Sequence, residues 1–356
     1  MGLLRIMLAI SVFMAHVRNP SWTRGFGGEN AVEIFFIISG FYIALILDKS
    51  YSKVSLFYKN RILRLYPIYY IVCILVLVRY FIFSNFTESL FNYPPEALTI
   101  GTIANTTLLG SDWLMFLQWQ DEGLHFGPFS DSQIPLHQML FIPQAWSLGV
   151  EITFYLFAPF FCKLRTRLIV IIFIILFGLR VIGWTNGLNF DPWSYRFFPF
   201  ELPMFIMGIL LYRIRKSAKI RQFLTIKQVY VVLLSAYFAF GYIMSKLTIL
   251  RFWQLVFLIL VSATIILFGS QNKTDNAIGE YSYPFYVSHV LVFSSYWTLL
   301  SLLDSRNQLF IYFSKQPIQI VLMLVFTLLV SKMLIRVVAP IEKLRDKNRG
   351  ISKSLS

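Results

Sequence analysis

Residues 145–159 read AWSLGVEITFYLFAP, an apolar run that a single carboxylate, that of Glu151, interrupts near its start. The run continues to Cys162, and an apolar helix-forming segment of about this length is typical of a membrane-spanning helix. A charged side chain inside a bilayer costs at least about 2.5–3.5 kcal/mol. The glutamate therefore indicates either a functional site or a polar contact between helices, because an apolar residue would insert more easily.

The whole chain shares this apolar character. Of its 356 residues, 57% are hydrophobic and 14% are charged, and the mean hydropathy is +0.66. This composition excludes a soluble domain and a disordered chain of the same length. The net charge of +15 is carried between apolar runs, so it indicates membrane topology rather than nucleic-acid binding. Cys73 and Cys162 lie in apolar runs outside any C-x-x-C pattern, so neither a disulfide nor a metal site is predicted.

Helix-forming apolar segments recur along the chain and predict an all-α integral membrane protein, a bundle of about ten transmembrane helices. The predicted spans are 3–17, 31–47, 67–83, 146–162, 167–184, 199–212, 229–245, 252–269, 283–303 and 317–338. A weakly apolar stretch at 99–119 is predicted to be re-entrant or to lie at the interface. We expect residues 1–340 to form a single transmembrane domain and residues 341–356 to form a short basic cytoplasmic tail.

Basic residues set the orientation of these spans. Lys and Arg are numerous in the loops 48–66 and 213–228, whereas the loop 84–145 has neither and carries only acidic charges. Cytoplasmic loops of multi-pass membrane proteins hold an excess of Lys and Arg. We therefore expect both termini in the cytoplasm, and a multi-pass protein of the cytoplasmic (inner) membrane.

Polar residues near the start of the chain form the first candidate site. Arg5 and His16 are eleven residues apart, so a helix places them on one face, about 16 Å apart along its axis. The predicted topology puts Arg5 at the cytoplasmic end of its span and His16 at the outer end. Glu33 is predicted at the outer mouth of the next span, where a carboxylate would raise the basicity of the imidazole and fix its tautomer. The alternative for all three residues is an anchoring role at the membrane interface.

A second basic pair precedes the third span. Arg61 and Arg64 are three residues apart and share a helical face. Two guanidinium groups suit the oxygens of a phosphate, although ordinary positive-inside charge is the alternative. Near the outer end of the fourth span, Ser147 and Glu151 also share a face.

Two further residues, each with an aromatic ring, complete the set of candidate residues. Trp146 is predicted to be an interfacial ring at the start of the fourth span. His289 falls in the inner half of its span, where a packed, hydrogen-bonded histidine is the favoured interpretation.

Five ordered blocks of this sequence resemble the membrane acyltransferase-3 family. The blocks are the R-x10-H spacing of Arg5 and His16, GG…VEIFFIISGF, FYKNRILRLYP, AWSLGVEITFYLFAP and YSYPFYVSH. They cover most of the chain and are specific only when taken together. The resemblance implies ten transmembrane helices, a cytoplasmic acyl-CoA donor, usually acetyl-CoA, and an extracytoplasmic acceptor such as a surface glycan or a lipid-linked saccharide.

The resemblance also assigns individual residues. It implies that Arg5 and His16 form the R-x10-H pair, that Glu33 takes the acidic position before FF-x-x-SG, and that Arg61 and Arg64 form the basic pair. The family often has Asp at the acidic position, so the carboxylate here reaches one methylene further.

The resemblance gives a reason for the carboxylate in the fourth span. Glu151 is expected on the outer side, where with Trp146 and Ser147 it would line the acceptor cavity or hydrogen-bond the catalytic pair. A structural polar link between helices is the competing interpretation.

These assignments predict a transmembrane O-acyltransferase. His16, oriented by Glu33, would act as general base on an acceptor hydroxyl that attacks the thioester, while Arg61 and Arg64 bind the phosphates of CoA. The acyl-pantetheine arm would pass Arg5. An acyl-histidine on His16 is an equally consistent variant. No bound cofactor is expected, because acyl-CoA enters as donor substrate, and the expected partners are the acceptor and membrane lipids, not nucleic acid.

Two other classes of protein are alternatives to an enzyme. A multi-helix transporter without acyl-transfer chemistry also embeds charges in the membrane. Carriers often show internal pseudo-symmetry, which is not visible in this sequence. A non-catalytic scaffold would not need a histidine and a carboxylate at the outer mouth.

Overall fold

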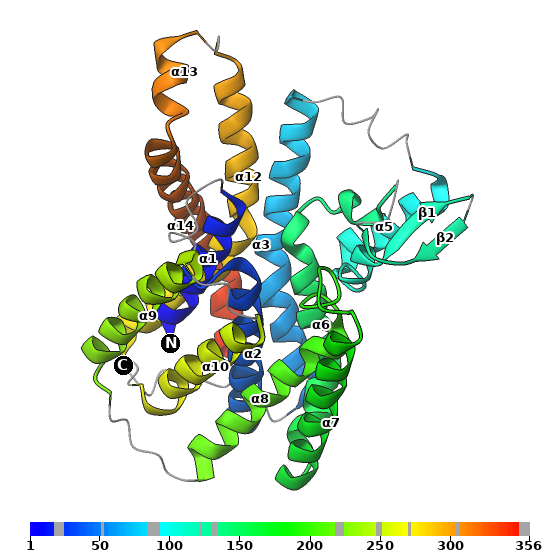
Figure 1. Ribbon diagram of the computed structural model, residues 1–356, viewed down its shortest axis with the longest axis vertical. Helices are drawn as coiled ribbons and strands as arrows, with labels where there is room; N and C mark the ends of the chain where they lie inside the picture. Colours follow the sequence, from blue (N-terminus) through cyan, green and yellow to red (C-terminus); the bar gives the residue numbers. More distant parts are fainter. Residues whose placement is uncertain are drawn as a thin grey trace. The chain divides into compact units, whose positions relative to one another are not determined.

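The computed structural model describes residues 1–17, 25–50, 53–83, 93–121, 123–129, 134–217, 224–246, 251–269, 272–303 and 306–348. Helices make up most of this part of the chain (Figure 1). It divides into two compact units. The first comprises Met1–Phe35 and Leu211–Leu344, and the second comprises Phe36–Leu210 and Arg345–Ser356. Helices α2 (Gly28–Lys49) and α8 (Phe198–Ser217) each pass from one unit into the other.

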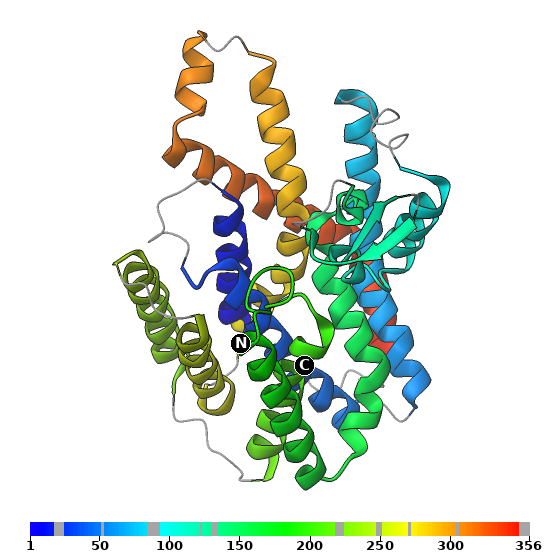
Figure 2. The same cartoon turned by 45° about the vertical axis from the view of Figure 1, so that its right-hand side comes forward.

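The first unit is built from helices at both ends of the chain. Besides parts of α2 and α8, it contains α1 (Gly2–His16), α9 (Ile226–Lys246), α10 (Arg251–Phe268), α11 (Lys273–Glu280), α12 (Ser282–Ser301), α13 (Gln308–Phe313) and most of α14 (Gln316–Asn348). Helices α9 and α10 lie side by side (Figure 2), and the rings of Phe240 and Phe257 stack between them at 5.9 Å.

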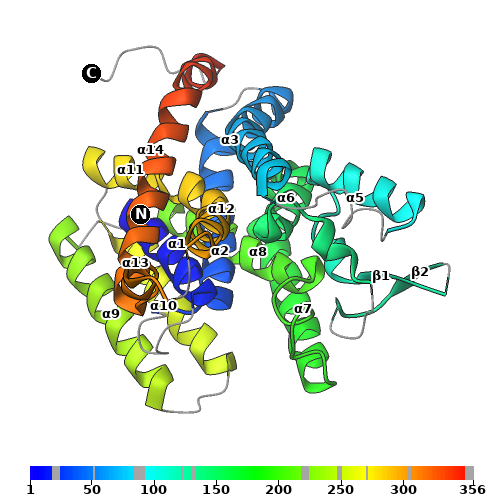
Figure 3. The ribbon, with the colours of Figure 1, turned by 90° about the horizontal axis from the view of Figure 1, so that it is seen from above.

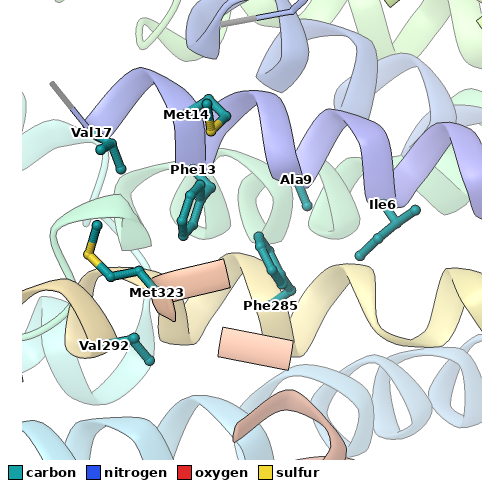
Figure 4. Close-up of a cluster of buried hydrophobic side chains, with 8 residues drawn as sticks. All are labelled: Ile6, Ala9, Phe13, Met14, Val17, Phe285, Val292 and Met323. Atoms are coloured by element: carbon teal, nitrogen blue, oxygen red, sulfur yellow. The ribbon is translucent and has the colours of Figure 1, made fainter. Parts of the chain in front are cut away.

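The core of the first unit lies where α1 meets α12 and α14 (Figures 3 and 4). Apolar residues recur three or four positions apart along α1, so they form one stripe of the helix. This stripe packs against α12, with the rings of Phe13 and Phe285 5.7 Å apart. The buried cluster consists of Ile6, Ala9, Phe13, Met14, Val17, Phe285, Val292 and Met323.

The beginning of α1 is held by α11. The carboxylate of Asp275 accepts hydrogen bonds from the backbone N–H groups of Gly2, at 2.8 Å, and Leu3, at 3.0 Å, and it also contacts the Met1 amino group. Helix N-termini carry N–H groups without intrahelical partners, so a carboxylate stabilises them. Gly2 also lies directly against Gly279, where a Cβ on either residue would clash. The N-terminus and the loop 270–282, both predicted to be cytoplasmic, therefore lie together.

Replacing Asp275 with alanine should lower the free energy of unfolding by about 0.5–2 kcal/mol, the usual value for a capping side chain. Burial raises the pKa of Asp275, but the hydrogen bonds from the Met1 amino group, Gly2 and Leu3 outweigh burial and hold the pKa below its ordinary value. A carboxyl with a lowered folded-state pKa stabilises the protein above the unfolded-state pKa of about 3.9, and the effect is lost as pH falls through the folded-state pKa. In thermal unfolding in detergent, wild type should melt higher at neutral pH, and the gap should close in acid. Equal melting temperatures at neutral pH would contradict this.

The second unit contains the middle of the chain. Besides parts of α2 and α8, it contains α3 (Val54–Phe83), α5 (Pro95–Thr107), α6 (Trp146–Lys163), α7 (Thr166–Thr185) and the end of α14. A β-hairpin of β1 (Leu117–Gln120) and β2 (Gly123–Phe126) pairs Leu117 with Phe126. Helices α3 and α6 lie side by side (Figures 1 and 3), and the hydroxyl of Tyr58 donates to the carbonyl of Leu156 at 3.0 Å.

Glycines bring α2 and α8 into backbone contact in the second unit. A Cβ on Gly40 would clash with the carbonyl of Phe205, and a Cβ on Gly208 would clash with the carbonyl of Ile37. Small residues at helix interfaces allow this close approach in membrane proteins.

Tyrosines of α3 hold the end of α5. Tyr69 and Tyr70 donate to the carbonyls of Asn105, at 2.8 Å, and Thr106, at 2.5 Å, and Tyr66 donates to the carbonyl of Thr107. The last carbonyls of a helix lack intrahelical partners, so these hydroxyls satisfy them. The stretch 99–119 was predicted to be re-entrant or interfacial. In the structure it comprises most of α5, a short turn that includes a 3-10 helix, and most of β1.

Each predicted span coincides with a helix, although several boundaries differ. Helix α3 begins at Val54 rather than at residue 67, because Tyr58 and Arg61 pack on α6 and extend the helix. Helix α14 passes through the predicted domain boundary at 340. Among the described residues, five helices are long and apolar enough to cross a membrane, and three shorter helices are also apolar. The count of ten crossings, the single domain and the cytoplasmic termini stay predictions.

Candidate active site

His16 ends α1 with its side chain exposed. Its Nδ1 lies 2.8 Å from the backbone carbonyl oxygen of Val12, one turn earlier. A carbonyl can only accept a hydrogen bond, so Nδ1 carries the hydrogen and the neutral ring has its lone pair on Nε2. This is the form that a general base or a nucleophile requires.

A second histidine lies against this ring. The ring centroids of His16 and His289 are 5.1 Å apart, with an angle of 61° between the planes. His289 is fully buried, and its Nδ1 lies 2.7 Å from the carbonyl oxygen of Tyr286. Its lone pair is therefore also on Nε2. Aromatic rings surround it, with centroids at 6.4 Å for Phe13, 6.0 Å for Tyr286 and 5.5 Å for Phe293.

The contact shows that the two depths expected for these side chains cannot both be right. The sequence placed His16 at the outer end of one span and His289 in the inner half of another, but touching rings lie at one level. Helices α1 and α12 both start next to α11, and α1 has only 15 residues, so it ends early. Helix α12 continues for about 18 Å beyond His289 at 1.5 Å per residue. The histidine pair thus lies in the first half of α12.

Glu33 is fully buried in α2, and its predicted partnership with His16 stays a prediction. The start of α2 adjoins the end of α1, because a Cβ on Gly28 would lie 2.9 Å from that of Ala15. Since the carbonyl of Val12 already engages Nδ1 of His16, the backbone fixes the tautomer that the carboxylate was expected to fix. Arg5 lies at the opposite end of α1, near Gly279 of α11.

The second unit holds the arginine pair predicted to bind phosphate. Arg61 is 3% exposed, and its Cζ lies 5.8 Å from the ring centroids of both Phe57 and Tyr155. Arg64 is half-buried one turn later. A charge that only sets topology would extend into water, so the burial of Arg61 favours a specific role.

Glu151 lies in the same unit as the arginines and has two hydrogen-bond donors. Its Oε1 accepts from Ser39 of α2 and from Tyr155 of α6, both at 2.5 Å. The carboxylate is therefore a polar link between two helices, the interpretation that competed with an acceptor-binding role. The acceptor-binding role of Glu151 stays a prediction.

The residues before Glu151 are buried. Ser147 donates to the carbonyl of Gln144 at 3.0 Å. Trp146 is 5% exposed and lies under the guanidinium of Arg196, whose Cζ is 4.5 Å from its ring centroid. Arg196 and Tyr195 cover the ring of Trp146, so it packs within the protein, and its position at the membrane interface stays a prediction. Among the described residues, no group of three His, Cys, Asp or Glu side chains could hold a metal ion.

Comparison of the sequence with known proteins identifies one family. The family model described as an acyltransferase domain, Acyl_transf_3, matches residues 1–336. The chain belongs to the acyltransferase-3 family. The predicted family is confirmed, and with its apolar helices the acyltransferase-3 chain is a multi-pass membrane protein.

A curated relative of this acyltransferase-3 chain carries a more specific name. The peptidoglycan O-acetyltransferase OatA of Listeria monocytogenes serovar 1/2a (strain ATCC BAA-679 / EGD-e) is 31% identical over 166 residues. That alignment covers 44% of this chain and 23% of the relative, so the chain matches about a quarter of the relative's length. No solved structure matches the chain.

The packed, hydrogen-bonded state predicted for His289 is confirmed, but its contact with His16 was not predicted. In the second unit, the two donors to Glu151 were not predicted either. Tyr155 follows Glu151 by four residues, so the helical spacing could have indicated their hydrogen bond. Ser39 and His289 reach their partners from helices distant in sequence, and no spacing rule finds such contacts.

Proposed function

We propose that this chain is a membrane O-acyltransferase that moves an acyl group from acyl-CoA to a hydroxyl group of an extracytoplasmic glycan. The proposed acyl group is acetyl. The observation that carries the proposal is the exposed His16 in a chain of this family: its Nδ1 engages a backbone carbonyl, and its ring centroid lies 5.1 Å from that of a second histidine. The name of the Listeria relative supports peptidoglycan as the acceptor. The donor is placed on the cytoplasmic side of the inner membrane, where acyl-CoA is available.

The proposed reaction uses one atom of His16. Its Nε2 takes the proton of the acceptor hydroxyl while the hydroxyl oxygen attacks the thioester carbonyl carbon. The C–S bond then breaks, the acyl ester stays on the glycan, and the CoA thiolate takes the proton back. In the acyl-histidine variant, Nε2 attacks the carbonyl first and the hydroxyl attacks the acylated ring.

Arg61 and Arg64 are assigned to the phosphates of the donor. Changing either residue to alanine should weaken acyl-CoA binding by about 1.5–3 kcal/mol, the value of a hydrogen bond to a charged group. Calorimetry on the purified protein measures this affinity. Lys59→Ala is the matched control, because Lys59 is an exposed cation on the same helix. Unchanged affinity in both arginine variants would leave them as topology charges.

We assign to Glu33 the role of stabilising the positive charge that forms on His16 when it takes a proton. Glu33→Gln keeps the shape and removes the charge, so turnover should fall steeply while acyl-CoA affinity stays nearly constant. Glu33→Asp keeps the charge with a shorter reach and should retain partial activity. The comparison is turnover at saturating donor. If the glutamine variant equalled the aspartate variant, the contribution of Glu33 would be packing in α2.

A membrane carrier is the other class of function considered, and mass spectrometry distinguishes the two. Cell-wall glycans are compared from cells with the gene, without it, and with the gene restored. An acyltransferase predicts ester-linked acetyl groups that vanish with the gene and return with it. Identical glycan acylation in the three strains would contradict the proposed acceptor. If the purified protein, given acyl-CoA and acceptor, released no CoA thiol, the proposed acyl-transfer activity would be wrong.

A further inference from the structure

His289 has a buried nitrogen that the reaction described above leaves unused. The side chain is fully buried, yet its Nε2 has no hydrogen-bond partner among the described residues. A buried acceptor without a donor is costly, because it has lost its hydrogen bonds to water. Such an atom indicates that a donor reaches it at another stage of the reaction.

The two histidines can form a hydrogen bond to each other through their Nε2 atoms only when one of the two rings carries an additional proton. Each Nδ1–H is donated to a carbonyl of its own helix, Val12 for His16 and Tyr286 for His289. Each neutral ring therefore presents only a lone pair at Nε2. Two lone pairs cannot bond to one another, whereas a proton on one Nε2 can be shared with the other.

We propose that His289 is a second functional histidine, whose Nε2 accepts a hydrogen bond from the imidazolium that forms on His16 during acyl transfer. The inference rests on the proposed function. Rings with centroids 5.1 Å apart and tilted by 61° are compatible with a direct N–H···N contact. Because this bond exists only after His16 has taken a proton, it stabilises the charged stage of the reaction and not the resting enzyme.

The surroundings of His289 strengthen such a bond. Phe13, Tyr286 and Phe293 enclose the ring, and Phe13 and Phe293 are themselves 4.7 Å apart. In an apolar enclosure a hydrogen bond to a charged group is stronger than in water. The carboxylate usually expected beside a catalytic imidazole is thus complemented here by a neutral second ring.

The acceptor hydroxyl supplies the proton in this reaction, and the CoA thiolate takes it up. The O–H bond of the acceptor breaks and an N–H bond forms on Nε2 of His16, while the oxygen bonds to the thioester carbon. The proton is held between the two Nε2 atoms. When the C–S bond breaks, the thiolate takes this proton, and both rings return to the neutral state.

Kinetics of two substitutions test the role of His289. Gln places an amide oxygen near the position of Nε2, so His289→Gln keeps an acceptor, whereas His289→Phe fills the aromatic enclosure without one. We expect turnover to fall about 10- to 100-fold in His289→Phe, with KM for acetyl-CoA nearly unchanged, and most of the loss to be restored in His289→Gln. Phe293→Leu alters the enclosure and keeps the acceptor nitrogen, so it should lose less turnover than His289→Phe. Equal loss in the Gln and Phe variants, or wild-type turnover in both, would overturn the proposal.

A readout independent of activity separates this inference from the proposed function. The chain has four histidines, so nitrogen-15 histidine labelling gives a small set of NMR signals. As His16 is protonated, a coupling across the N–H···N bond to His289 should appear, and it should vanish in His289→Gln. If the purified protein transferred no acetyl group but showed this coupling, the proposed function would fail and the histidine pair would stand. Absence of the coupling in folded, active protein would overturn the pair.

Discussion

Replacing His16 with alanine should lower acyl transfer about 10²- to 10⁴-fold, the range for loss of a general acid–base group, and more if an acyl-histidine forms. The side chain is exposed at the end of α1, so its removal leaves the buried stripe of that helix intact. Expression and thermal unfolding should stay close to wild type. Transfer of acetyl from acetyl-CoA, measured with the purified variant, checks the loss.

The matched control is His125→Ala. His125 is an exposed histidine on β2 and has no place in the proposed chemistry. It should keep full turnover. If His16→Ala kept wild-type turnover, both the general-base mechanism and the acyl-histidine variant would be wrong.

Replacing Arg180 with alanine should lower the free energy of unfolding by about 3–5 kcal/mol, because it leaves the charge of Glu201 buried without its arginine. Both side chains are almost completely buried, and Nη1 of Arg180 lies 3.3 Å from Oε1 of Glu201. Arg180 also donates to the carbonyls of Phe200 and Ser194, both at 3.0 Å. The guanidinium therefore links the end of α7 to the first turn of α8 and to the segment before it.

A double variant separates the charge from the packing at this pair. Arg180→Met combined with Glu201→Leu removes both charges and fills similar volume, and replacing a buried ion pair with apolar residues is often neutral. Unfolding in detergent should show the double variant to be more stable than Arg180→Ala. If the single and double variants lost the same stability, the carbonyl hydrogen bonds of Arg180, rather than its ion pair, would account for the effect.

The helices were largely predictable because their signal is local. The apolar composition and the apolar runs decided the membrane class and the positions of the spans, and the absence of Lys and Arg in the loop 84–145 decided only the predicted orientation. The boundaries of α3 were not predictable from hydropathy, because the polar turn around Arg61 becomes helical through its packing on α6. The hairpin was missed for a related reason, since each strand has only four residues.

The candidate site was predictable only in part. The face shared by Arg5 and His16 follows from helical spacing, but the meeting of His16 with His289 depends on how α1 packs on α12. Counting residues inward from the ends of a span assumes that every helix crosses the full bilayer, and α1 is too short for that. The role of Glu151 could not be chosen from sequence, because Ser39, one of its two donors, lies on another helix.

The most direct test of the account is transfer by the purified chain reconstituted in lipid vesicles. Acetyl-CoA labelled in the acetyl group is supplied together with peptidoglycan fragments, and the ester on the glycan and the free CoA thiol are measured. We expect labelled ester and thiol to appear in equal amounts with wild type and His125→Ala, and the rate of both to fall by at least about 100-fold with His16→Ala. Ester formation at the wild-type rate in His16→Ala, or no ester with wild type, would contradict the proposed function.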